Sequence, residues 1–246
     1  MRWPYPRVIA HRGGGSCAPE NTLAALRTGH ARGFRAVEFD VMLSADSHPV
    51  LIHDETLERT TSGHGAVSTT PLSALARLDA GSWFGREFKG EPLPGFAAAA
   101  RLCLDLGLLA NVEIKPAGGY AHETGRIVAS QALALWAGAP VPPLLSSFEA
   151  AALEAAQAAA PALPRALLFD AVPADWQPRA ERLDCIAIHC NATRLDQALA
   201  SAILGAGYAL ATWTVNDVAS ARRLFSWGVT AVFTDRLDLM APEFSG

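Results

Sequence analysis

The sequence contains few cysteines and lacks the segments that would place a protein in a membrane or on a nucleic acid. Its 4 cysteines among 246 residues form no C-x-x-C pair, and a chain of this length needs no disulfide scaffold, so reduced thiols are expected. The alanine-rich stretch 148–162 is too short for a membrane span and is interrupted by Glu149 and Glu154. The N-terminus has no apolar signal segment, and the net charge of -4 gives no basic footprint. These absences favour a cytoplasmic protein with no stable membrane association and no nucleic-acid partner.

Short apolar runs, often containing β-branched residues, alternate with longer segments of helical periodicity. Hydrophobic residues make up 50% of the chain, which is enough for one large core. Strands that alternate with helices imply a parallel sheet. Eight such units in about 250 residues predict an α/β fold of the (β/α)8 TIM barrel type rather than an open sheet. The predicted strands cover residues 7–11, 36–41, 111–115, 144–148, 165–169, 185–189, 209–215 and 231–235. The predicted helical segments include residues 21–33, 94–107, 148–160, 195–207 and 218–228.

One region departs from this alternation. After the second strand, a turn-rich SADSH connection leads into PVLIHD, which predicts a β-hairpin that extends strand two and brings His53 near Asp40. The segment that follows is rich in Gly, Ser and Thr and has no long helical period, so a small excursion over one mouth of the barrel is expected. We predict a single domain, 1–246, with an inserted subregion at about 54–94.

Three carboxylates are expected to converge at the barrel mouth, because function in this fold sits at the C-terminal ends of the strands. Side chains two residues apart on a strand share a face, so Glu38 points the same way as Asp40, and Glu113 the same way as Lys115. At about 4 Å and an effective dielectric of about 20, each pair of carboxylates repels by about 4 kcal/mol. Lys115 and Arg12 do not obviously offset this repulsion, whereas a divalent cation does, and oxygen ligands favour Mg²⁺, Ca²⁺ or Mn²⁺ over zinc. The intervening apolar residues should pack outward against helices: Val37, Phe39, Val41, Val112 and Ile114.

Each polar residue at the predicted mouth, taken alone, also has a structural explanation. His53 before Asp54 fits a loop turn, Asn21 is most simply the N-cap of the helix that follows, and Trp213 fits a core position. The apolar alternation nevertheless brings these groups to one end of one barrel. That convergence favours a functional site.

The ordered motifs HRG, PENT, EFDV, HD, EIK, SF, WTVN and TD resemble those of the glycerophosphodiester phosphodiesterases, in particular the bacterial cytosolic type. The segment 58–84 is similar to the region inserted in that family, and the resemblance covers residues 8–235. It implies a metal-dependent (β/α)8 hydrolase that cleaves glycerophosphodiesters to glycerol 3-phosphate and an alcohol.

The resemblance also implies residue roles. Those roles are metal binding by Glu38, Asp40 and Glu113, general acid–base catalysis by His11 and His53, phosphate binding by Arg12 and Lys115, a pocket wall at Trp213, and support from behind the site by Glu20. The sequence leaves open which histidine is the acid, whether water or the glycerol 2-hydroxyl attacks, and whether the protein is a monomer or a homodimer. His189 and Asn191 have no clear counterpart in the family and are either substrate contacts or ordinary loop residues, of which we favour the second.

Two alternative functions remain open at the level of sequence. The first is a related phosphodiesterase acting on phosphoinositides or lysophospholipids, for which Trp83, Phe84 and Phe88 would be candidates for an apolar rim. The second is a non-catalytic barrel that binds a phosphate ligand. A barrel of the second kind is expected to have lost a histidine or a metal ligand, and none is missing.

Overall fold

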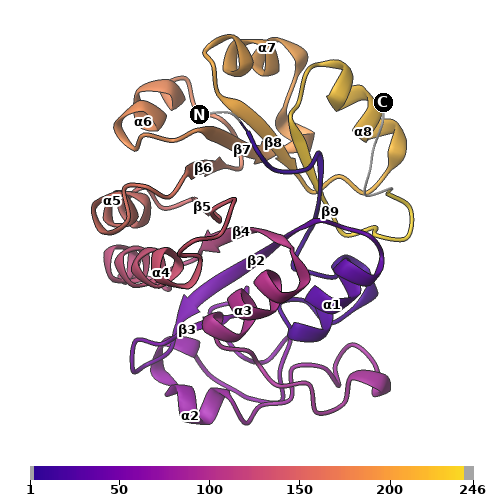
Figure 1. Cartoon of the computed structure of the whole chain (residues 1–246), viewed down its shortest axis with the longest axis vertical. Helices are drawn as coiled ribbons and strands as arrows, with labels where there is room; N and C mark the ends of the chain where they lie inside the picture. The colour runs from indigo at the N-terminus through magenta and orange to yellow at the C-terminus, as the bar shows by residue number, and fades with distance from the viewer. Residues whose placement is uncertain (1–2, 241–246) are drawn as a thin grey trace.

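The protein forms a closed barrel of eight parallel strands with helices on its outside (Figure 1). The computed structural model describes residues 3–240; residues 1, 2 and 241–246, which belong to the predicted domain 1–246, lie outside the described residues. The strands are β1 (Val8–Ala10), β2 (Ala36–Leu43), β3 (Pro49–Leu51), β4 (Leu109–Ile114), β5 (Leu144–Ser147), β6 (Arg165–Phe169), β7 (Ala187–Asn191), β8 (Ala209–Trp213) and β9 (Ala231–Thr234). The α-helices are α1 (Leu23–Ala31), α2 (Leu72–Leu75), α3 (Phe96–Leu106), α4 (Ala121–Leu135), α5 (Ala150–Ala159), α6 (Trp176–Arg182), α7 (Gln197–Gly205) and α8 (Val218–Ser226).

The strand order confirms the predicted barrel and hairpin. Neighbouring strands follow the order β1-β9-β8-β7-β6-β5-β4-β2, and β1 also pairs in parallel with β2, which closes the ring. The extra strand β3 is antiparallel to β2, with Val41 opposite Leu51. Several predicted strand ends differ from the observed ones by one or two residues, and the strand placed at 185–189 is displaced as a whole to β7. Its start is delayed because the backbone N–H of Cys185 donates to the carbonyl of Ala180 and closes the end of α6.

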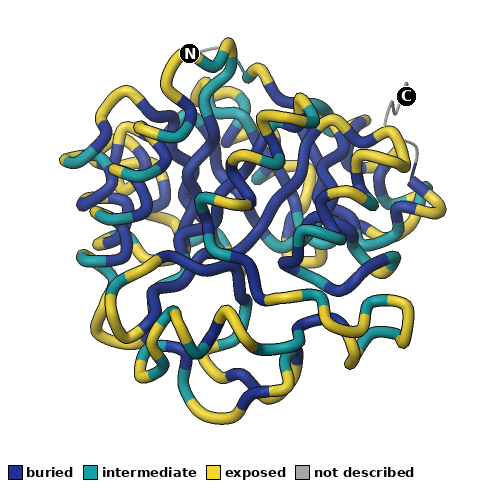
Figure 2. Tube along the Cα trace, turned by 60° about the horizontal axis from the view of Figure 1, so that its bottom comes forward, coloured by how far each residue is buried: buried dark blue, intermediate teal, exposed yellow. Residues whose placement is uncertain are grey.

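The outward faces of the strands form the main core with the helices. Val37, Phe39 and Val41 lie in one apolar cluster with Leu26 of α1 and Phe96 of α3, as the alternation predicted. Figure 2 shows this buried interior as a continuous dark region enclosed by exposed outer turns. No helix within residues 3–240 is both long and apolar enough to span a bilayer.

The end of the barrel where the strands begin is filled by the N-terminal segment. Trp3 and Tyr5 pack there against Leu144 and Ala187, and the Tyr5 hydroxyl donates to the carbonyl of Pro142 at 2.9 Å. Among residues 3–240 this segment fills that end, and the site cavity lies at the other end, where the strands finish.

The segment between β3 and α3 has a small apolar cluster of its own. It extends beyond β3, at the bottom of Figure 1, and contains α2 and the 3₁₀ turns η2 (Val67–Thr69) and η3 (Arg86–Phe88). The cluster consists of Met42, Val50, Ile52, Leu57, Val67, Leu75, Ala80 and Leu93. Trp83 and Phe84 of this segment line a cavity shared with His11 and Arg12, so the insertion borders the barrel mouth.

Candidate active site

A cavity of about 270 Å³ opens at the C-terminal ends of the barrel strands. The predicted site residues that line it are His11, Arg12, Glu38, Asp40, His53, Glu113, Lys115 and Trp213. Glu20 is not among its lining residues and lines the neighbouring cavity with Arg12. Residues from distant segments therefore meet in one place, at the end of the barrel where this fold carries its sites.

The three predicted carboxylates form one buried cluster. Asp40 of β2 is paired in register with Glu113 of β4, and one oxygen from each of Glu38, Asp40 and Glu113 lies within 4.8 Å of the others. Burial and the nearby Asp40 charge raise the pKa of Glu113 to about 8 and raise the pKa of Glu38 well above its usual range. Burial acts in the same direction on Asp40, but the cations of Lys115 and Arg12 outweigh it and lower the pKa of that carboxyl. Oε1 of Glu38 has no hydrogen-bond partner among residues 3–240. A cluster in which two of the three carboxyl groups resist ionisation and one oxygen is unsatisfied fits a hard divalent cation.

Asn21 holds Asp40, a role that the sequence analysis missed. Its Nδ2 donates to Oδ2 of Asp40 at 2.8 Å, and its Oδ1 accepts from the Asp40 backbone N–H at 3.0 Å. The predicted N-cap assignment is wrong, because Thr22 caps α1 by accepting from the N–H of Ala25. Asn21 instead has a left-handed backbone with φ 59°, which asparagine tolerates better than most residues. This conformation leaves its amide free to pair with β2.

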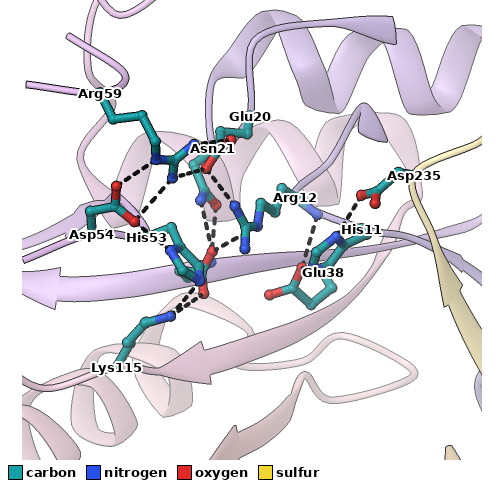
Figure 3. Close-up of polar contacts among 11 residues, drawn as sticks. His11, Arg12, Glu20, Asn21, Glu38, His53, Asp54, Arg59, Lys115 and Asp235 are labelled. Carbon is teal, nitrogen blue, oxygen red and sulfur yellow. Dashed lines mark hydrogen bonds and ion pairs between the residues drawn. The ribbon is translucent and has the colours of Figure 1, made fainter. Parts of the chain in front are cut away.

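Arg12 lies among three carboxylates, two from β2 and one from the loop before α1 (Figure 3). Its backbone N–H donates to Glu38 at 2.8 Å, Nη1 donates to Glu20 at 2.7 Å, and Nε lies 3.7 Å from Asp40. Glu20 also accepts two bonds of 2.8 Å from Arg59, an insertion residue that the sequence analysis did not single out. Arg12 is thus held in place from behind while it lines the cavity.

His11 is positioned by β9 and the neighbouring loop. Its Nδ1 lies 2.7 Å from Oδ1 of Asp235, and its Nε2 lies 3.8 Å from Glu38. Asn216 donates to the other oxygen of Asp235 at 3.1 Å. Because Nδ1 is engaged by Asp235, Nε2 is the ring atom that faces the carboxylate cluster.

His53 is positioned by the start of the insertion. Its Nδ1 lies 2.7 Å from Oδ1 of Asp54, and its Nε2 accepts from Nζ of Lys115 at 2.5 Å. Arg59 donates to both oxygens of Asp54, at 2.5 and 3.0 Å. Burial is the largest cause that lowers the pKa of His53, and the Arg12 and Lys115 cations add to it against the opposing charge of Asp40.

The cavity has an apolar wall on the side of β5 and β8. Trp213 contacts Phe148 edge to face, with ring centroids 5.6 Å apart. Phe148 is 43% exposed and lies at the rim. This wall suits the carbon skeleton of a small substrate better than a charged group.

His189 and Asn191 are not loop residues, so that prediction was wrong. Both lie in β7, which ends two residues beyond the predicted strand 185–189 and so also includes Asn191. His189 points into the barrel, lines the cavity and is 1% exposed. Asn191 ends the strand and donates to Asp170 at 2.8 Å. The period-2 alternation with inward Ala187 was a usable signal for His189, because a displacement by two residues leaves the faces of the strand unchanged.

Comparison with known proteins agrees with this geometry. Residues 11–239 match the family model described as the glycerophosphoryl diester phosphodiesterase family. A glycerophosphodiester phosphodiesterase from Caldanaerobacter subterraneus subsp. tengcongensis is 32% identical over 232 residues, covering 93% of this chain and 93% of its own. The structure of an Oleispira antarctica phosphodiesterase in complex with the product sn-glycerol-3-phosphate is similar at 40% identity and a TM-score of 0.89, over 94% of this chain and 93% of that one. A glycerophosphodiester phosphodiesterase from Agrobacterium tumefaciens str. C58 shares 27% identity at a TM-score of 0.78, over 96% and 99% of the two chains.

Proposed function

Because this chain belongs to the glycerophosphoryl diester phosphodiesterase family, we propose that it hydrolyses soluble glycerophosphodiesters to glycerol 3-phosphate and an alcohol. The product bound by the similar Oleispira antarctica phosphodiesterase supports this choice of product. We also propose the cytoplasm as the place where the reaction occurs. The substrate is a small molecule.

The observation that carries the proposal is the pair of histidines beside one carboxylate cluster. His11 and His53 each engage an aspartate through Nδ1, line the same cavity, and lie on opposite sides of Arg12 in Figure 3. Hydrolysis of a phosphodiester needs one group to take a proton from the nucleophile and another to give one to the leaving alcohol. Two imidazoles whose Nε2 atoms face one cavity meet both needs near neutral pH.

Arg12 and Lys115 are the proposed phosphate-binding groups. A phosphodiester carries one negative charge that grows toward the transition state, so cations already in place stabilise the transition state more than the ground state. Both side chains line the cavity. Arg12 is fixed by Glu20, and Lys115 lies 3.8 Å from Asp40.

Glu38, Asp40 and Glu113 would hold one divalent cation, Mg²⁺, Ca²⁺ or Mn²⁺. Their buried oxygens and the unpartnered Oε1 of Glu38 fit such an ion. When bound, the ion supplies positive charge that neutralises the cluster and stabilises negative charge on the phosphate oxygens. Asn21 keeps Asp40 oriented throughout, and Trp213 walls the pocket beside the substrate.

The test is a substrate panel with controlled metal. Glycerophosphocholine, -ethanolamine, -glycerol and -inositol are compared with a lysophospholipid and a phosphoinositide, with EDTA and then with Mg²⁺, Ca²⁺ or Mn²⁺. We expect the soluble diesters to dominate, EDTA to abolish turnover, and a divalent ion to restore it. Faster cleavage of the lysophospholipid or the phosphoinositide would instead favour a lipid phosphodiesterase. Binding of glycerol 3-phosphate without any turnover would indicate a non-catalytic barrel.

A further inference from the structure

The cavity runs from an exposed rim to a deeply buried floor. Phe148 at the rim is 43% exposed, whereas the lining residues His189 and Asn111 are 1% and 4% exposed. Asn111 stands two residues before Glu113 on β4, about 6.6 Å along the strand at about 3.3 Å per residue, and is paired in register with Glu38 of β2. The closed end of the cavity therefore lies at the level of Glu38, below Asp40 and Glu113.

The polar groups at this closed end lack protein partners. Neither ring nitrogen of His189 has a hydrogen-bond partner among the described residues, and neither does Oδ1 of Asn111. Nδ2 of Asn111 is satisfied, because it donates to Ser146 at 2.9 Å. Buried polar atoms in folded proteins are nearly always hydrogen-bonded, so three unsatisfied atoms at the end of one cavity indicate that a ligand or water binds there.

The chemistry of the floor selects a neutral hydroxyl. Burial lowers the pKa of His189 to about 3, so its ring is neutral and offers one donor and one acceptor. The Asn111 oxygen adds a second acceptor. The other lining groups near His189 are apolar: Leu168 is its partner in the β6 register, and the Phe233 ring lies 5.1 Å from the imidazole. A hydroxyl on a short carbon chain matches these groups better than a second charge does.

The glycerol moiety is the part of the substrate that suits a closed end. Every glycerophosphodiester contains it, whereas the esterified alcohol varies in size and charge and needs the open rim. With the phosphate held at Arg12 and Lys115, a three-carbon chain directed inward brings its terminal hydroxyl toward the floor.

We propose that His189 is a specificity-determining residue that hydrogen-bonds the terminal hydroxyl of the substrate's glycerol, together with Asn111. The inference rests on the proposed hydrolysis of glycerophosphodiesters and identifies how this site selects them. A site built to hydrogen-bond a hydroxyl discriminates strongly against an analogue that lacks it, because its buried polar groups are then left unpaired.

The test compares two diesters that differ in this hydroxyl alone. Glycerophosphocholine carries it, and 2-hydroxypropyl phosphocholine does not. The measurement is kcat/KM for both substrates with wild type, His189→Leu, His189→Gln and the control Thr212→Val. Thr212 is also fully buried with an unpartnered hydroxyl, but it is not among the residues that line the cavity.

We expect wild type to favour glycerophosphocholine by about tenfold or more, and His189→Leu to reduce that ratio to near one by lowering kcat/KM for glycerophosphocholine. His189→Gln, which keeps a donor and an acceptor, should retain part of the preference, and Thr212→Val all of it. Thermal unfolding checks that each variant is folded. If a variant does not fold, the ratio of kcat/KM for the two diesters in wild type still tests the inference.

Three results would overturn the inference: a wild-type ratio near one, an equal loss of activity on both diesters in His189→Leu, or an unchanged ratio in that variant. Each leaves the diesterase function intact, because wild type still cleaves glycerophosphocholine. If wild type cleaves neither of the two diesters, that result would instead contradict the proposed function, and the inference with it.

Discussion

The two site histidines share one kind of partner but differ in their surroundings. Nδ1 of each ring lies 2.7 Å from an aspartate oxygen, of Asp235 for His11 and of Asp54 for His53. Nε2 of His11 lies 3.8 Å from the carboxylate of Glu38, whereas Nε2 of His53 accepts from the Lys115 ammonium at 2.5 Å. One imidazole is thus flanked by two acids, and the other lies between an acid and a cation.

The two halves of the site, His11 with Asp235 and His53 with Asp54, also come from different parts of the fold. Asp235 follows β9, so the His11 half is built by the barrel itself. Asp54 begins the insertion and is held by Arg59, so the His53 half depends on a segment with its own small apolar cluster. Arg59 links the halves, because it also donates to Glu20, which holds Arg12. The insertion therefore completes the site as well as bordering its mouth.

The largest expected effect comes from removing either imidazole. His11→Ala and His53→Ala should each lower kcat on glycerophosphocholine by about 10²–10⁴-fold, because each removes a general acid or base. The double variant should lose less than the product of both, since the groups act on one transition state.

A p-nitrophenyl diester substrate distinguishes which of the two histidines is the general acid and which is the general base. Its leaving group needs little protonation, so it should rescue the variant that lacks the acid far more than the variant that lacks the base. Wild-type kcat in both single variants would show that neither histidine takes part in proton transfer.

The next effect concerns the aspartates behind the histidines. Asp235→Asn and Asp54→Asn should each lower kcat by about 10–100-fold, as for other hydrogen-bond partners that orient functional histidines. KM should change little, because neither carboxylate lines the cavity between the rings. Steady-state kinetics and the pH profile of kcat check this. A profile that keeps its shape in both variants would mean that the aspartates have only a structural role.

His189 extends the comparison to an imidazole without any carboxylate partner in the described structure. Its folded-state pKa of about 3 is below the ordinary value of 6.5, so between these values the unfolded chain binds a proton that the folded chain does not. Its contribution to stability is therefore present above pH 6.5 and is lost as the pH falls toward 3, by about 1.4 kcal/mol per pH unit. Urea unfolding at pH 7.0 and 5.5 should show a smaller loss of stability in His189→Leu than in wild type. Parallel losses would contradict the assigned neutral state.

The smallest effect is expected for Arg59→Ala. Arg59 is 44% exposed, and exposed ion pairs contribute about 0–1 kcal/mol, so kcat should fall less than tenfold. Because Arg59 reaches His53 through Asp54, adding the change to Asp54→Asn should cost little more. Arg194→Ala is the matched control, since Arg194 is 57% exposed, pairs with Asp170, and neither residue lines the cavity. An equal loss of kcat in the two arginine variants would mean that Arg59 does not position His53.

Local periodicity was enough to predict the barrel and the carboxylate cluster. A strand turns each second side chain to the same face whatever lies around it, so the alternation alone placed Glu38 and Asp40 together. Glu113 followed from the same argument on β4, because parallel strands of a barrel end at one mouth. These predictions needed the alternation and the fold class, both of which the sequence contains.

The contacts between distant segments were decided only by the tertiary structure. Asn21 looked like a helix cap, but the close approach of its loop to β2 made it a partner of Asp40. Arg59 lies in a segment without periodicity, so nothing local indicated that it would join Glu20 to Asp54. The alternation along β7 turns His189 inward, but only the packing of the barrel leaves both of its ring nitrogens without a hydrogen-bond partner among the described residues. In each case the deciding distance joins segments whose relative position depends on how the whole chain packs, whereas the orientation of a side chain along one strand depends on the strand alone.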